Sequence, residues 1–258
     1  THKEISEIKT SLIQLTNKII NPNFGFFKKD LSKINELKIK KLEILDSSLS
    51  TIDKIYWLTE YCKRYGTLPF AGIARAAFIS TQILKSLEEL DVINLAEYND
   101  FLGSLNTITC KMEEDLYNFS LNSISKKSFL DKYGHLRPGT YDILSLRYDE
   151  NFENYFSKIN PKRKKKNSFS FQKKHKIKIE NIISGSGLEI TCNELINFIK
   201  ESIEAREYSK FIFTSTLSEI IKLIQELGLS VNKSKDEMSH VDFKTILSLY
   251  NDLDHQFL

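Results

Sequence analysis

Apolar residues recur every three or four positions through most of this 258-residue chain, and this spacing limits its fold more than any other feature. Each such segment gains one apolar stripe when it is helical. No alternating strand pattern extends beyond a few residues, and there is no internal repeat. The sequence therefore predicts an all-α, mainly α-helical chain, an antiparallel multi-helix domain with short connections. We expect helices over residues 3–21, 30–44, 51–65, 71–90, 95–123, 126–133, 189–227 and 242–253.

Glycines and capping residues predict where these helices begin and end. Gly66 is expected to end the third helix, with a short turn over residues 67–70. A kink is expected near Gly103, and the helix over 189–227 is expected to break near Thr214. Thr191 to Glu194 matches the Ser/Thr-x-x-Glu pattern, which predicts a capped helix start.

Composition narrows the class of function. The chain has 37 basic and 34 acidic residues, so no global field indicates a nucleic-acid or membrane partner. Three widely spaced cysteines without a CxxC pair disfavour a disulfide framework and a metal site, and favour a cytoplasmic location. No apolar run approaches the roughly 18 residues of a membrane span.

Residues 1–258 are expected to form a single helical domain, since 41% hydrophobic content is enough for a substantial core. The chain begins at Thr1 instead of Met, which we interpret as excision from a larger protein. Residues 161–178 are predicted to form a mobile basic loop, because dense like charges resist packing. Binding of a polyanion such as RNA is the less favoured interpretation of that loop.

The loop at 132–149 is the strongest candidate for a functional site. It concentrates Gly, Pro, His, Arg and Tyr in an otherwise Lys-, Leu- and Ile-rich sequence. His135 is a donor or acceptor near neutral pH, and Arg137 and Arg147 are candidate clamps for oxygen atoms. Tyr141 is a candidate pocket wall. The alternative is a structural loop whose Arg side chains and Asp142 satisfy buried backbone groups.

Two further segments carry candidate binding residues. Arg75 lies about one turn into the helix that follows Pro69, where free N–H groups can bind an anion. Tight helix packing explains the small residues of this segment equally well. Arg206 and Lys210 are four residues apart, so they share a helix face that could hold a phosphate. A solvated face paired with acids such as Glu207 is the alternative there.

At these residues the chain resembles phosphoenolpyruvate-synthase-like phosphotransferases, which include relatives of pyruvate phosphate dikinase and rifampin phosphotransferase. The resemblance rests on Lys132 to Asp142 with Arg147-Tyr148, on Arg206 to Phe211, and on Lys235 to Met238 with Asp242. The segment Tyr65 to Phe78 is similar to the subgroup of L-glutamine kinases from bacterial surface-polysaccharide gene clusters. The resemblance covers most of residues 50–250 and is most specific around 132–149.

The resemblance implies a three-part enzyme in which an ATP-grasp domain uses ATP and Mg²⁺ to phosphorylate a histidine on a swivelling domain. The helical domain between them binds the acceptor, here L-glutamine, whose amide is phosphorylated as ATP is converted to AMP and phosphate. This chain matches the helical part. It has neither a glycine-rich ATP-grasp loop nor the sequence context of the swivelling histidine. Alone, it is therefore expected to be inactive and to hold no cofactor or metal. The implied catalytic residues are His135 and Arg137. The implied substrate-binding residues are Arg75, Tyr141, Asp142, Arg147, Arg206 and Glu207.

The rival interpretation is a non-catalytic helical interaction module, with the basic loop at 161–178 as its docking surface. Convergence of the candidate arginines on one cleft would favour the acceptor-binding domain.

Overall fold

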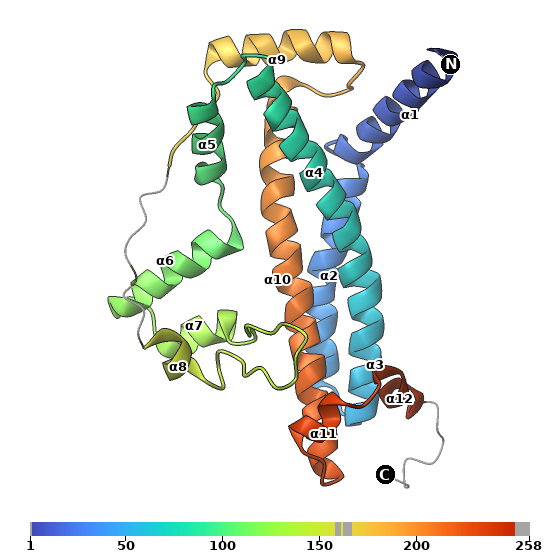
Figure 1. Ribbon diagram of the computed structural model, residues 1–258, viewed down its shortest axis with the longest axis vertical. Coiled ribbons are helices and arrows are strands. Elements are labelled where there is room, and N and C mark those ends of the chain that lie inside the picture. The colour runs from blue at the N-terminus through green and yellow to red at the C-terminus, as the bar shows by residue number, and fades with distance from the viewer. Residues whose placement is uncertain (1, 158–160, 162–166, 251–258) are drawn as a thin grey trace. The chain divides into compact units, whose positions relative to one another are not determined.

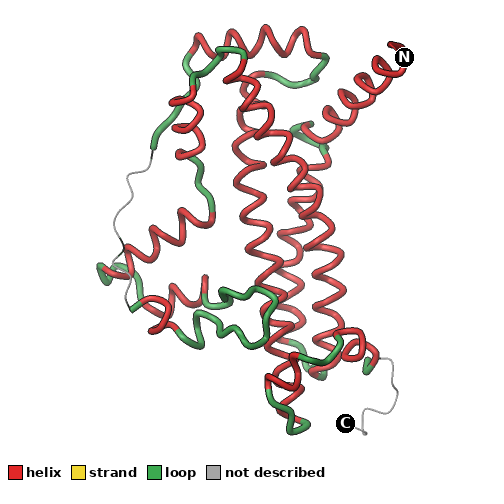
Figure 2. Tube along the Cα trace, in the orientation of Figure 1, coloured by secondary structure: helices red, strands yellow, loops and turns green. Residues whose placement is uncertain are grey.

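The computed structural model describes residues 2–157, 161 and 167–250. The chain is 74% helical, and no strand occurs within these residues (Figures 1 and 2). The prediction of an all-α chain is therefore confirmed. The helices are α1 (His2–Ile20), α2 (Phe26–Asp46), α3 (Thr51–Tyr61), the π-helix η1 (Cys62–Thr67), α4 (Leu68–Glu89), α5 (Leu95–Ser104), α6 (Ile108–Ser120), α7 (Lys126–Tyr133), α8 (Phe152–Phe156), α9 (Lys173–Ser186), α10 (Cys192–Ser230), α11 (Lys235–Ser239) and α12 (Phe243–Ser248).

The described residues belong to two compact units, each assembled from three separate stretches of sequence. The first unit draws on residues 1–33, 69–110 and 164–209, and the second on residues 34–68, 111–163 and 210–258. Helices α2 and α10 contribute residues to both units. The prediction of one domain over residues 1–258 stays a prediction.

In the first unit, the beginnings of α2 and α10 pack against α4. The rings of Phe27 and Phe198 meet edge to face, with centroids 5.5 Å apart. Ser80 and Ser202 are completely buried, and their hydroxyls hydrogen-bond at 2.6 Å. Small side chains at this contact let the two helix backbones approach closely, and the hydrogen bond satisfies polar atoms that would otherwise be unpaired in the core.

In the second unit, α3, η1 and the later parts of α2 and α10 pack together around Gly66. A Cβ on Gly66 would lie 2.9 Å from Phe213 Cβ and 3.0 Å from Leu37 Cδ2. The prediction that Gly66 ends a helix was wrong, and so was the turn over 67–70, because the chain continues as a π-helix directly into α4. The glycine serves close packing instead of helix termination.

A cluster of aromatic side chains supports α7 and α8 in the second unit. Phe129, Tyr133, Phe152 and Phe156 are buried against one another. The Tyr133 hydroxyl donates to Asp115 Oδ2 at 2.7 Å, so the polar tip of this buried ring is satisfied. This cluster holds the end of α7, where the candidate functional loop begins.

Three other expectations about helix boundaries were wrong for reasons of packing. The helix expected over 95–123 is two helices, because the chain becomes extended at buried Leu105. The break expected near Thr214 is absent, because α10 is buried on several sides there and continues through residues 212–216. Residues 173–178 of the expected basic loop are helical, because His175 is buried at the start of α9. Residues 162–166 of that loop lie outside the described part of the chain.

Several predicted helix ends are confirmed. Thr191 and Glu194 form the expected capping box at the start of α10, with Thr191 N–H donating to Glu194 Oε2 at 2.9 Å. Ser125 caps α7, and Gly134 ends it. Asp242 caps α12 at the expected start, but this helix ends at Ser248, before the expected end at residue 253.

One helical stretch, Thr51–Glu89, is long and apolar enough to cross a membrane, with a mean hydropathy of 1.2 in its most apolar window. The core helices of soluble proteins also meet these two criteria. Ile52, Ile55 and Leu58 are buried within this stretch, as are Ile73 and Leu84. One third (33%) of its most apolar window is buried within the described residues.

Gly66→Ala should destabilise the chain by about 1–3 kcal/mol, because a methyl group overpacks the contact with Phe213 and Leu37. Gly185→Ala in α9 is the matched control, since nothing lies within 4 Å of the added Cβ. It should be neutral or stabilising by up to about 1 kcal/mol. Urea unfolding measures both changes, and an equal effect of the two substitutions would contradict the packing role of Gly66.

Candidate functional site

The predicted functional loop at 132–149 is closed at its neck by backbone hydrogen bonds. Tyr148 N–H donates to the Leu136 carbonyl at 2.8 Å, and Asp149 N–H donates to the Gly134 carbonyl at 3.2 Å. A Cβ on Gly134 would lie 2.5 Å from a backbone carbonyl oxygen of α7, so the turn requires glycine at this position. Backbone hydrogen bonds therefore hold the two ends of the loop together without any contribution from side chains.

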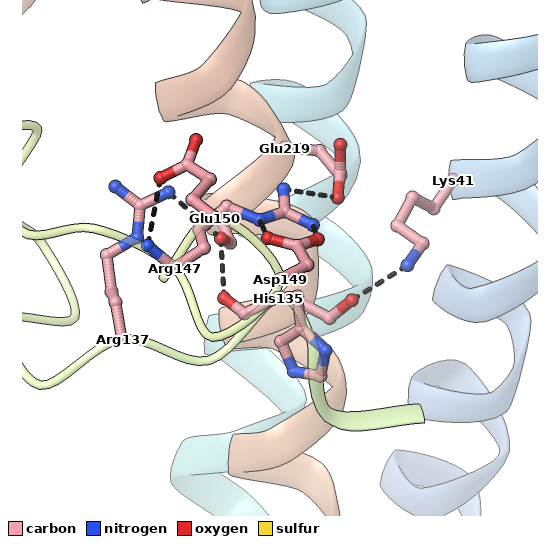
Figure 3. Close-up of polar contacts among 9 residues, drawn as sticks. Lys41, His135, Arg137, Arg147, Asp149, Glu150 and Glu219 are labelled. Carbon is pink, nitrogen blue, oxygen red and sulfur yellow. Dashed lines mark hydrogen bonds and ion pairs between the residues drawn. The ribbon is translucent and has the colours of Figure 1, made fainter. Parts of the chain in front are cut away.

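Arg147 fastens this neck to α10 through two carboxylates (Figure 3). Its Nε and Nη2 donate to the two oxygens of Asp149 at 3.0 and 2.7 Å, and its Nη1 donates to Glu219 Oε1 at 2.8 Å. Burial alone would lower the pKa of this guanidinium, but the hydrogen bonds and charges of Asp149 and Glu219 outweigh it and raise the pKa. These contacts favour a structural role for Arg147, and its predicted role in substrate binding stays untested.

Arg137 is equally buried but differently surrounded. It is 8% exposed, and no carboxylate pairs with it among the described residues. Nη2 donates to Ser218 Oγ and Nη1 to the Asp142 carbonyl, both at 3.2 Å, while Nε has no partner. Burial lowers the pKa of Arg137, and the charge of Glu150 offsets this in part. A desolvated guanidinium without a bound carboxylate is suited to an anionic ligand.

His135 lies beside α10 with one ring nitrogen unused. Its carbonyl accepts from Ser218 Oγ at 2.7 Å, and its ring meets the Phe211 ring at 4.7 Å. Burial, with the charges of Lys41 and Arg147, lowers the pKa of His135 to about 3, and a hydrogen bond to the Phe211 backbone opposes this shift. Nε2 is buried without a partner. The ring is therefore neutral at pH 7. If its one N–H faces the Phe211 backbone, Nε2 carries a free lone pair.

Lys41 of α2 approaches the same group of residues. Its Nζ donates to Ser215 Oγ at 2.8 Å, and burial lowers its pKa. Sequence reasoning missed this residue, because one lysine among 31 carries no local signal. It also missed Ser218 and Glu219, which lie on α10 far from the loop in sequence.

The tip of the loop faces solvent. Tyr141 is 69% exposed, so within this unit it does not act as the wall of a buried pocket. Asp142 Oδ1 accepts from Leu144 N–H at 2.9 Å, as expected for an Asp that stabilises a turn. Gly139 N–H donates to Ser145 Oγ at 3.0 Å. The substrate-binding roles predicted for Tyr141 and Asp142 stay untested.

The remaining candidates belong to the first unit. Arg75 and Arg206 are both exposed. Arg206 lies 5.5 Å from the centroid of the Phe78 ring and pairs with Glu207 at 3.6 Å. A solvated ion pair and a cation–π contact account for Arg206 without a ligand. Whether these residues share a cleft with the loop stays untested, because the loop belongs to the second unit.

In the part of the chain that the structure describes, no group of three or more His, Cys, Asp or Glu side chains is arranged to hold a metal ion. Comparisons of the chain with family models, with characterised proteins and with solved structures found no match.

Arg147→Met should destabilise the chain by about 2–4 kcal/mol, because it leaves the partly buried Asp149 and Glu219 without their shared partner. Arg64→Met is the matched control, since the exposed Arg64–Glu60 pair contributes about 0–1 kcal/mol. Chemical unfolding measures both. Similar small losses in the two variants would show that Arg147 does not hold the loop.

The free energy of unfolding should fall as the pH is lowered from about 7 to 5. Unfolded His135 binds a proton near its ordinary pKa of 6.5, whereas the folded ring stays neutral down to about 3. The unfolded state therefore binds more protons in this interval, and stability changes by up to about 1.4 kcal/mol per pH unit. Urea unfolding of His135→Gln should show a weaker pH dependence, while exposed His240→Gln should match the unmodified chain. Parallel curves for all three would refute the burial of a neutral His135.

Proposed function

We propose that this chain binds the acceptor substrate of an ATP-dependent phosphotransferase that works through a phosphohistidine. The observation that carries the proposal is Arg137, a buried guanidinium with an unpartnered Nε and no carboxylate partner among the described residues. Keeping such a charge out of water is costly, and a ligand carboxylate would compensate it. The resemblance of residues 132–149 to phosphoenolpyruvate-synthase-like phosphotransferases supports the same function.

L-Glutamine is the acceptor that we propose. Its α-carboxylate suits the fork of Arg137, and its α-amine requires an acid nearby, for which Asp142 and Glu150 are candidates. Neutral His135 offers a lone pair to a donor group of the acceptor, which suits orientation or proton transfer. ATP, Mg²⁺ and the phosphohistidine would come from ATP-grasp and swivelling domains, and the product would serve modification of a surface polysaccharide. We place the protein in the cytoplasm, where its three free cysteines would stay reduced.

A helical interaction module is the second candidate. The observation that favours it is the apolar face of α1, on which Ile5, Ile8 and Leu12 are 65%, 60% and 58% exposed. An exposed apolar stripe of this kind is typical of a partner-binding helix.

L-Glutamine should raise the thermal unfolding midpoint of the chain in a concentration-dependent way, because a ligand that binds the folded state stabilises it. Arg137→Gln should abolish the shift, and exposed Arg64→Gln should keep it. Differential scanning fluorimetry of the three proteins measures the effect. Acetate at equal ionic strength is the control for nonspecific anion binding.

If glutamine leaves the midpoint unchanged, glutamine is rejected as the acceptor. If glutamine protects Arg137→Gln as well as the unmodified chain, the assignment of Arg137 is wrong.

A further inference from the structure

We propose that Lys41 and His135 form a second anion site for a phosphoryl group: His135 Nε2 accepts a hydrogen bond from its hydroxyl, and Lys41 Nζ donates to its charged oxygens. This site is separate from Arg137. In Figure 3, Arg137 and Lys41 lie on opposite sides of the Arg147–Asp149 pair. The phosphoryl class of the ligand rests on the proposed function, whereas the anion site itself rests on the contacts described below.

The first support is the environment of Lys41. Its Nζ has a hydroxyl partner, Ser215 Oγ, and no ion pair within the described residues. Lys28 and Lys132 also reach distant segments and are paired there with Glu201 and Asp115. Lys178 donates to the Asp91 carbonyl instead, but it is exposed, so water compensates its charge. A half-buried ammonium whose only hydrogen-bond partner is a neutral hydroxyl has no negative group in contact to balance its charge.

Glu219 does not neutralise the charge of Lys41. Among the charged groups that affect Lys41, Glu219 has the largest effect, and it raises the pKa that burial lowers. Its Oε1, however, accepts from Arg147 Nη1 at 2.8 Å. Since Arg147 already uses this carboxylate, an added anion would be stabilised beside Lys41.

The second support is the unused Nε2 of His135. The side chain is 8% exposed, and Nε2 is buried without a partner. Since Nε2 has no partner, we assign the interaction of the ring with the Phe211 backbone to Nδ1–H, which leaves Nε2 as an acceptor. A buried acceptor with no donor is costly, so a ligand that brings a donor is favoured.

The third support is that one face of α10 brings these two groups together. Phe211, Ser215 and Ser218 are spaced at i, i+4 and i+7, so they share a helix face. Phe211 holds the His135 ring, Ser215 holds Lys41, and Ser218 holds the His135 carbonyl. Lys41 is also the strongest single charge acting on His135.

These two groups together select the chemistry of the ligand. Lys41 requires an anionic acceptor, and His135 Nε2 requires a donor. Hydrogen phosphate offers both in one group, because it has charged oxygens and one hydroxyl. An ionised carboxylate lacks the donor, and a water molecule lacks the charge.

Thermal unfolding with sodium phosphate or sodium sulfate at about pH 8 tests the site. Both anions are tetrahedral and doubly charged there, but sulfate has no hydroxyl to donate. Phosphate should bind about tenfold more tightly than sulfate, because sulfate leaves Nε2 unpaired. Sodium chloride at equal ionic strength is the reference. Equal effects of phosphate and chloride would overturn the proposal.

Lys41→Gln should lose the phosphate-dependent stabilisation, whereas Lys38→Gln should keep it. Lys38 lies on the same helix and is exposed, so this control removes the same charge outside the site. Retention of the effect in Lys41→Gln would reject the site. In the unmodified chain, phosphate should also shift the ¹⁵N resonance of His135 Nε2, and an unchanged resonance would reject the role of the imidazole.

The outcomes separate this inference from the proposed function. Glutamine protection that depends on Arg137, without any effect of phosphate, would reject the Lys41–His135 site and keep the proposed function. Phosphate protection that depends on Lys41, without any effect of glutamine, would keep the anion site and reject glutamine as the acceptor.

Discussion

The ion pairs of Arg147 with Asp149 and Glu219 are the interaction on which the candidate site depends. They join the neck of the loop to α10 in a place where Arg147 is 6% exposed. A buried charge of this kind is tolerated when it is paired and hydrogen-bonded. With the neck fixed, the loop backbone places His135 and Arg137 beside Ser218, whose hydroxyl contacts both residues.

The contrast between the three cations of this region explains its binding potential. Arg147 is paired with carboxylates, whereas Arg137 and Lys41 are held by hydroxyl and backbone oxygens. Buried donor and acceptor atoms without partners lower the stability of the free protein. A ligand that supplies these partners restores that free energy when it binds. The second unit therefore combines a rigid support with two cations that suit anionic groups.

Part of this site could be predicted because its residues are close together in sequence. The density of Gly, Pro, His and Arg at 132–149 identified the loop, and His135, Arg137 and Arg147 indeed lie together. Their separate roles could not be predicted, because these depend on which carboxylates reach each guanidinium. Lys41, Ser215 and Glu219 had no local signal, since they are ordinary helix residues brought to the loop by packing.

The sequence by itself determined those features that depend on residues close together in the chain. Apolar spacing determined most of the long helices, although not α9, whose first residues were expected in a loop. Local hydrogen bonds determined the caps at Ser125, Thr191 and Asp242. Tertiary structure alone decided that the helix continues through Gly66 and ends at Leu105, because contacts with distant segments outweigh local preferences there. It also decided which charges are neutralised, since burial and pairing arise only when separate helices pack together.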